Sequence, residues 1–140
     1  MRSIGYRAWD KKNKQMLTVT SIVCQTIHNP LITQFIEGRN KAGDYYCLKF
    51  EDVELFEYTG LHDCNDKPIY EGDIVKMLDD WIDHYKLYSN HSIEFGSGTF
   101  RLENGVPLYD CLDAEKDFEQ CSFEIIGNKY SNPELLRTEQ

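Results

Sequence analysis

The 140-residue sequence lacks the segments that would carry a chain into or across a membrane. No apolar run approaches the roughly 18–20 residues that a transmembrane helix needs. The amino-terminal residues contain no apolar core of the kind found in a secretory signal peptide. The composition, 41% hydrophobic and 28% charged, is that of a globular chain rather than a disordered one. We therefore expect a soluble, cytoplasmic protein.

Signatures of nucleotide binding and of hydrolysis are also missing. There is no Gly-x-Gly-x-x-Gly, no phosphate loop ending in Gly-Lys-Ser/Thr and no Gly-x-Ser-x-Gly. The five cysteines include no Cys-x-x-Cys pair, which argues against a zinc knuckle or a redox dithiol. An odd number of cysteines in a cytoplasmic chain predicts reduced thiols that act as small hydrophobes. We expect no cofactor, no metal and no enzymatic activity.

One short segment has the residue types of a metal site. Asp79, Asp80, Asp83 and His84 supply carboxylates and an imidazole. In a helix, Asp80 and His84 would share a face at spacing i,i+4. Ligands from one short helix rarely complete a coordination shell, so a solvated acidic segment is the favoured interpretation.

Short β-prone stretches separated by turn residues dominate the pattern. A strand, the polar turn at 10–14 and a returning strand predict a β-hairpin at the amino terminus. Gly96-Ser97-Gly98 predicts a second hairpin, because its glycines supply the positive φ that a tight turn needs. Residues 78–84 are interpreted as a short helix or a loop, and Asn132-Pro133 predicts the start of a helix. The strands are expected at 3–9, 16–19, 54–58, 69–77, 93–95, 99–102 and 122–126.

This pattern predicts a mainly β (α+β) fold with one or two short helices. Many short strands with tight turns favour a small barrel or sandwich over a parallel α/β arrangement.

Charge is distributed unevenly along the chain. Residues 1–50 hold eight Lys+Arg and three Asp+Glu, whereas residues 51–140 hold seven and twenty-one. The net charge of −9 argues against a protein that mainly binds nucleic-acid backbones. Three explanations remain open. The basic part folds against the acidic part, copies associate through opposite charges, or the acidic part serves a basic partner or imitates nucleic acid.

One group of residues combines an aromatic ring with positive charge. These five residues are candidates for partner binding: Arg7, Trp9, Lys11, Lys12 and Lys14. An aromatic ring among cations can stack on a nucleic-acid base while the cations contact phosphates. Packing of Trp9 in a hydrophobic core is the competing interpretation.

Four blocks of sequence stand out along the chain: Tyr6–Lys14, with Tyr-Arg-Ala-Trp-Asp; Tyr58–Val75, with Ile-Tyr-Glu-Gly-Asp-Ile-Val; Ile93–Phe100; and Glu124–Leu136. These blocks resemble the YopX family of bacteriophage and prophage proteins. They follow the family's order over nearly the whole chain.

The resemblance implies one YopX-like domain over residues 1–140. Residues 1–58 would form an amino-terminal β-hairpin extension and residues 59–140 a small SH3-like β-barrel. It also implies a protein made in the cytoplasm of an infected or lysogenic bacterium, and it supplies no catalytic residues.

We therefore expect a phage accessory protein that binds a host or phage protein, or copies of itself, in a regulatory role. The alternative is a nucleic-acid-related module, either a weak DNA or RNA binder through the basic hairpin or an acidic nucleic-acid mimic. No membrane partner is expected.

Overall fold

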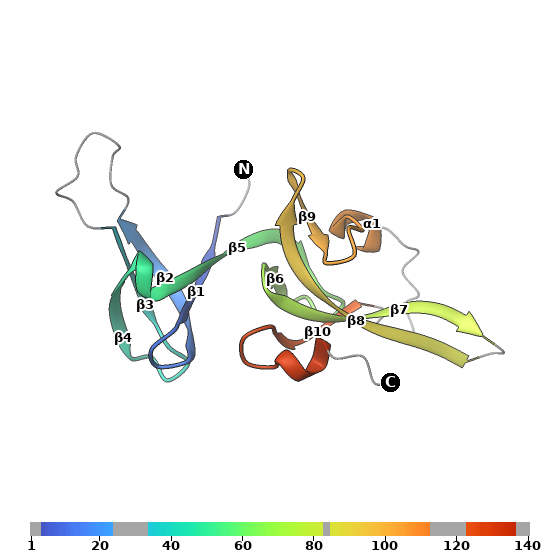
Figure 1. The fold of residues 1–140 in the computed structure, drawn as a ribbon, viewed down its shortest axis with the longest axis horizontal. Coiled ribbons are helices and arrows are strands. Elements are labelled where there is room, and N and C mark those ends of the chain that lie inside the picture. Colours follow the sequence, from blue (N-terminus) through green and yellow to red (C-terminus); the bar gives the residue numbers. More distant parts are fainter. Residues whose placement is uncertain (1–3, 24–33, 83–84, 113–122, 137–140) are drawn as a thin grey trace. The chain divides into compact units, whose positions relative to one another are not determined.

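The computed structural model describes residues 4–23, 34–82, 85–112 and 123–136, and within these the fold is mainly β (Figure 1). The chain forms two compact units that meet in the sequence between Glu57 and Tyr58. Strand β5 (Val53–His62) runs through this boundary, so its first half belongs to the N-terminal unit and its second half to the C-terminal unit.

The N-terminal unit is one antiparallel sheet with the strand order β4-β3-β2-β1-β5. Its other elements are β1 (Tyr6–Asp10), β2 (Gln15–Val23), β3 (Phe35–Arg39), β4 (Tyr45–Lys49) and the 3-10 turn η1 (Phe50–Asp52). The predicted hairpin is present, because β1 pairs with β2 from Arg7 opposite Thr18 to Asp10 opposite Gln15.

Asp10 holds the turn of that hairpin. Its side chain is fully buried, and one carboxylate oxygen accepts hydrogen bonds from the backbone N–H groups of Lys12 and Asn13. The other oxygen accepts from the side-chain amides of Asn13, at 2.8 Å, and Gln15, at 3.2 Å. An Asp side chain that bonds the backbone two and three residues later closes a turn by itself. This leaves Lys14 in the left-handed region, with a φ of 51°.

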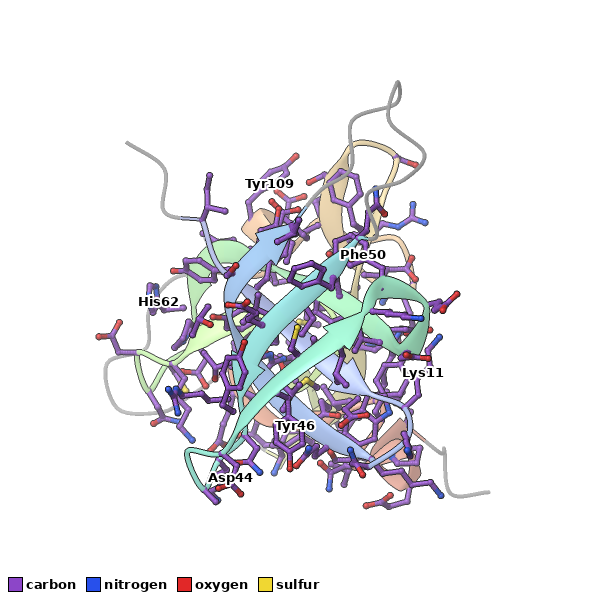
Figure 2. The ribbon with its side chains drawn as sticks, turned by 90° about the vertical axis from the view of Figure 1, so that its left-hand side faces the viewer. Lys11, Asp44, Tyr46, Phe50, His62 and Tyr109 are labelled. Atoms are coloured by element: carbon purple, nitrogen blue, oxygen red, sulfur yellow. The ribbon has the colours of Figure 1, made fainter. Side chains whose placement is uncertain are left out.

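The core of the N-terminal unit lies on one face of the sheet. Ala8, Leu17, Ile36 and Val53 are buried there. Six partly buried side chains pack against them, two of which are labelled in Figure 2: Val19, Ile22, Tyr46, Leu48, Phe50 and Leu55. On β1, burial alternates as predicted, so that Arg7 and Trp9 lie on the opposite face, half-buried.

The C-terminal unit combines the second half of β5 and β6 with a four-stranded antiparallel sheet of order β10-β7-β8-β9. The elements are β6 (Pro68–Tyr70), β7 (Asp73–Ile82), β8 (Tyr85–Gly96), β9 (Thr99–Leu102), α1 (Leu108–Leu112), β10 (Phe123–Asn128) and η2 (Pro133–Leu136). Among the described strands, β9 and β10 are the outer strands in the order of this sheet, and no closed barrel is found. The core contains Ile69, Val75, Ile93, Leu102, Leu108 and Phe123.

Three local predictions can be compared with these elements. Residues 78–82 continue β7, so the expectation of a helix or loop is wrong for this segment; residues 83–84 lie outside the described part. The hairpin at Gly96-Ser97-Gly98 is confirmed, and Ser97 and Gly98 both have positive φ, at 52° and 79°. The helix predicted at Asn132-Pro133 is the 3-10 turn η2.

Asp63 ties together two segments that are distant in the sequence. Its buried carboxylate accepts backbone N–H bonds from Asn65 and Lys67, both at 2.9 Å, and from Ile125, at 3.0 Å. The first two bonds close the turn between β5 and β6, and the third holds β10. The backbone N–H of Cys64 adds a bond to the Phe123 carbonyl.

We expect Asp63→Asn to lower the free energy of unfolding of the C-terminal unit by about 2 kcal/mol. The amide keeps one acceptor oxygen but places an NH₂ group where a backbone N–H now donates. Urea unfolding followed by Trp81 fluorescence, in a Trp9→Phe background, measures the loss. Asp66→Asn is the matched control, because Asp66 is exposed in the same turn with a φ of 63° that asparagine tolerates. A D63N loss no larger than that of D66N would contradict this role.

The Asp10 turn predicts a pH dependence. Burial raises the pKa of Asp10, but the hydrogen bonds from Asn13, Gln15 and Lys12 outweigh it and hold this pKa below the ordinary value of 3.8. A lowered folded-state pKa stabilises the fold above the unfolded-state pKa, and the contribution is lost as pH falls through the folded-state pKa. The isosteric variant Asp10→Asn should therefore melt lower than the parent at neutral pH, and the gap should narrow in acid. Thermal melts at about pH 7 and about pH 3 test this; a constant gap would refute it.

Candidate functional site

The structure divides the five predicted partner-binding residues into two groups. Lys11, Lys12 and Lys14 are exposed at the tip of the β1–β2 hairpin. Arg7 and Trp9 lie further down β1, on the sheet face opposite the core. The tip is close to acidic residues, because Lys11 Nζ lies 3.4 Å from the carbonyl oxygen of Glu51 and Lys11 N donates to the carbonyl of Asp52.

Arg7 is part of a row of side chains across the outer face of the N-terminal sheet. Thr18 stands opposite Arg7, Arg39 opposite Thr18, and Tyr45 opposite Arg39. The guanidinium of Arg39 lies 5.9 Å from the ring centre of Tyr45. Burial raises the pKa of Tyr45, and the nearby Glu37 carboxylate raises it further. This row combines two cations with an exposed aromatic ring.

The distribution of charge differs from that of the two sequence segments when the chain is divided at the boundary between the units. Residues 3–57 hold seven Lys+Arg and seven Asp+Glu, so the N-terminal unit is neutral overall. Its lysines are balanced by acidic residues in η1 and β5. Residues 58–140 hold seven Lys+Arg and seventeen Asp+Glu. The acidic excess therefore belongs to the C-terminal unit.

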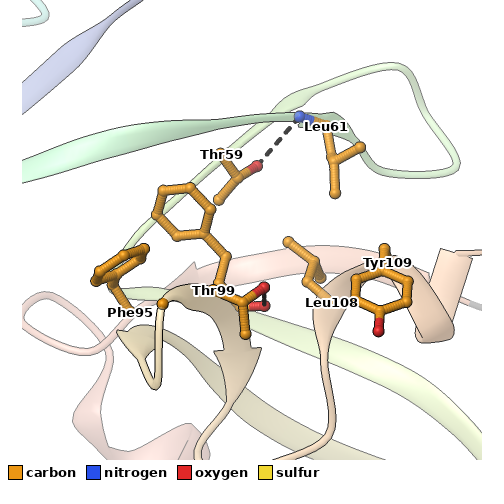
Figure 3. A pocket seen from close by; sticks show the side chains of 8 residues that line it. Thr59, Leu61, Phe95, Thr99, Leu108 and Tyr109 are labelled. Atoms are coloured by element: carbon orange, nitrogen blue, oxygen red, sulfur yellow. Dashed lines mark hydrogen bonds between the residues drawn. The ribbon is translucent and has the colours of Figure 1, made fainter.

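The C-terminal unit contains a pocket of about 290 Å³. Figure 3 shows Thr59 and Leu61 of β5 on one side, facing the hairpin of β8 and β9 and the start of α1. The lining residues are Thr59, Leu61, Phe95, Gly98, Thr99, Phe100, Leu108 and Tyr109.

The aromatic wall of the pocket is an extension of the core face of the β8–β9 hairpin. Ile93 and Leu102 stand opposite each other on that face and are buried. Phe95 and Phe100 form the next pair on the same face, with ring centres 5.2 Å apart and planes at 66°. Phe95 is nevertheless 56% exposed. The apolar face of the hairpin therefore continues beyond its buried residues to side chains that are exposed.

The other face of this hairpin fixes its shape. Arg101 Nε donates to Glu94 Oε1 at 2.9 Å, and its guanidinium also donates to Ser97 Oγ at 3.2 Å. A Cβ atom on Gly96 would lie only 2.6 Å from this guanidinium, so glycine allows it to lie across the strand. These contacts hold the tip of the hairpin while Phe95 and Phe100 face the pocket.

The β5 wall of the pocket has no free hydroxyl for a ligand, because the Thr59 hydroxyl is already hydrogen-bonded. Thr59 Oγ1 donates to the carbonyl of Ile69 at 2.7 Å and accepts from the N–H of Leu61 at 3.2 Å. Gly60, at a φ of 84°, allows the irregular course of β5 there. On α1, Leu108 is buried and Tyr109 is 56% exposed. The only ionisable lining group is the Tyr109 phenol, so the pocket is suited to holding an apolar group.

Comparison with known proteins now adds family information. The YopX protein family matches residues 5–137. The chain belongs to the YopX family. Its structure is similar to the crystal structure of protein EF1440 from Enterococcus faecalis, with a TM-score of 0.63 and 25% identity over 98% of this chain and 100% of that one. No curated protein matches.

The blocks that carry the YopX resemblance contain the residues that hold the turns. Asp10 and Asp63 have been described above. Asp73, which is 1% exposed, accepts a hydrogen bond from the N–H of Tyr70 at 2.9 Å. Next to it, Gly72 donates to the carbonyl of Ile93 and accepts from the N–H of Lys129. These family residues therefore have structural roles.

Sequence reasoning missed the pocket of this YopX-family chain, although the signal was present. The hairpin at Gly96–Thr99 was predicted, and its alternation places Phe95 and Phe100 on the face of Ile93 and Leu102. Two aromatic residues in the last pair before a turn indicate an apolar face that extends beyond the core. The contribution of Leu61 and Tyr109 depends on tertiary structure.

The remaining chemistry-bearing residues lie elsewhere. Among the described residues, no group of three or more His, Cys, Asp or Glu could hold a metal ion. Cys47 and Cys111 are free thiols, as expected, and burial, followed by the Asp110 carboxylate, raises the pKa of Cys111. Cys64 is disulfide-bonded, so the expectation of a reduced thiol is wrong at this position. Cys24 and Cys121 lie outside the described residues. No helix of the described chain is long and apolar enough to cross a membrane.

One hydrogen-bond chain has the order of a catalytic triad. Ser89 Oγ lies 2.7 Å from His91 Nε2, and His91 Nδ1 lies 2.9 Å from Glu103 Oε1. An ionised carboxylate only accepts, so His91 Nδ1 donates to Glu103; in a neutral imidazole Nε2 would then accept from the serine hydroxyl. A triad also needs a site that holds the substrate carbonyl beside the hydroxyl. None of these three residues lines the pocket.

We expect Ser89 to be unreactive, because it does not line the pocket and therefore has no site beside it that would hold a substrate carbonyl. Incubation of the full chain with a fluorophosphonate probe, followed by intact-mass measurement, should show no stoichiometric adduct. The control is Ser89→Ala, which should likewise show no adduct after incubation with the probe. A full adduct on Ser89 that disappears in His91→Ala would contradict this expectation and identify a nucleophilic serine.

Proposed function

We propose that this YopX-family protein is a non-enzymatic, regulatory binding module that holds a segment of another protein in the pocket of its C-terminal unit. The observation that carries the proposal is the exposure of Phe95 and Tyr109, each 56%, beside a cavity of about 290 Å³. Exposed apolar patches on soluble domains mark interaction sites. The cavity is at the lower end of the roughly 300–1,000 Å³ of small-molecule sites, so it suits one side chain of a partner.

The cellular setting is part of the same proposal. The partner is a host or phage protein, or a second copy of this chain, in the cytoplasm of a bacterium that carries the phage or prophage. Family membership supports this setting, because the resemblance to YopX proteins implies a protein made in an infected or lysogenic bacterium. An SH3-like barrel for the C-terminal unit also remains a proposal, supported by the antiparallel pairing of strands from β7 to β10.

A second candidate function is weak binding of single-stranded nucleic acid by the N-terminal unit. It is favoured by the exposed lysines of the hairpin tip and by the outer-face row of Arg7, Thr18, Arg39 and Tyr45. The neutral charge of the unit argues against high affinity. If the tip contacts phosphates, the variant K11Q/K12Q/K14Q should reduce the slope of log affinity against log salt by about 2 for a single strand.

The leading proposal is tested by affinity capture from host-cell lysate, with and without nuclease. We expect the tagged parent protein to retain a nuclease-resistant partner and Phe95→Ser to lose it. The matched control is Tyr88→Ser, because Tyr88 is also an exposed aromatic residue of β8, at 40%, but does not line the pocket. Circular dichroism should show both variants folded, since neither side chain belongs to the buried core. Equal capture by F95S and Y88S would reject the pocket as the site.

A further inference from the structure

The partner's chemistry follows from the net charge of the unit that contains the pocket; this inference rests on the proposed function. Among the described residues of the C-terminal unit, eleven are Asp or Glu and five are Lys or Arg. An excess of negative charge on one unit attracts positively charged partners and repels phosphate backbones.

Three of the five basic side chains in the described part of the unit contact groups of the same unit. Arg101 pairs with Glu94 at 2.9 Å. Lys76 lies 4.7 Å from the ring centre of Tyr88, and Lys129 lies 5.3 Å from that of Tyr130. The Glu94 carboxylate offsets the charge of Arg101, the basic residue that follows the lining residue Phe100. Asp110, which follows the lining residue Tyr109 in the sequence, is exposed.

The pocket itself selects for size and for an apolar surface. Its three rings, from Phe95, Phe100 and Tyr109, present apolar faces that also attract cations. The volume of about 290 Å³ accommodates a single large side chain. The lining residues carry no charged side chain, so the pocket suits an uncharged anchor.

We propose that the pocket binds a basic segment of a partner protein, with one large apolar residue as the anchor and flanking Lys or Arg residues as the charged contacts. The anchor contacts Phe95, Phe100 and Tyr109. The flanking cations face the acidic surface of the unit, including Asp110.

Three fluorescein-labelled peptides test the proposal against the full chain by anisotropy. The basic anchor peptide is acetyl-Lys-Lys-Ser-Trp-Ser-Lys-Lys-amide, and the other two replace Trp by Ala or every Lys by Glu. We expect the basic tryptophan peptide to bind at least about tenfold more tightly than either of the others. Its affinity should fall as salt rises, since screening weakens exposed charge contacts.

Protein variants locate the binding. Phe95→Ser should weaken the basic tryptophan peptide at least about tenfold, and Asp110→Asn should weaken it less, by a few fold. Tyr88→Ser is the control and should leave binding unchanged.

Two results overturn the inference. One is equal or tighter binding of the Glu peptide that is lost in F95S; this would leave the pocket as a docking site while removing the basic partner. The other is no binding of the basic tryptophan peptide up to about 1 mM. Failure of the proposed function has a different signature: binding, or lysate capture, that F95S does not alter.

Discussion

The C-terminal unit depends on the buried carboxylate of Asp63. With three backbone N–H bonds it closes the turn after β5 and attaches β10 to that turn, 62 residues further along the chain. A charged acceptor is suited to this role, because bonds to an ionised group are stronger than neutral ones and a buried carboxylate must be satisfied. The consequence reaches the pocket, since Thr59 and Leu61 immediately precede this turn on β5.

Asp10 and Asp73 are buried aspartates that hold turns in the same way. The residues that carry the YopX resemblance are therefore structural, and a function has to be sought in other residues. All three aspartates are buried, and each accepts a backbone N–H at a turn. Each lies within a block that carries the family resemblance. The blocks therefore identify a fold, because a turn needs a particular side chain at a particular position. The pocket wall needs only apolar surface of the right shape, which several residue types can supply.

Turns were the part of this structure that sequence could predict. Asp10 and Gly96-Ser97-Gly98 act on their own neighbours, so local chemistry is sufficient. Residues 78–82 were misread because their acidic residues suggested solvent, whereas pairing with β8 makes them a strand. The pocket was not predicted for a related reason, because Phe95 and Tyr109 come to line one pocket only through tertiary structure. The partner-binding candidates around Trp9 stay a prediction.

The exposure of Phe95 is accompanied by contacts that hold the tip of the β8–β9 hairpin. A hairpin of two strands is only marginally stable by itself. Here the Glu94–Arg101 pair, the bond to Ser97 and the left-handed turn hold the strands out to their tip. The two rings are kept in contact with each other and with solvent at the same time. A binding surface that is already formed loses less conformational entropy when a partner arrives, and this is what a small apolar pocket needs in order to bind a single anchor residue.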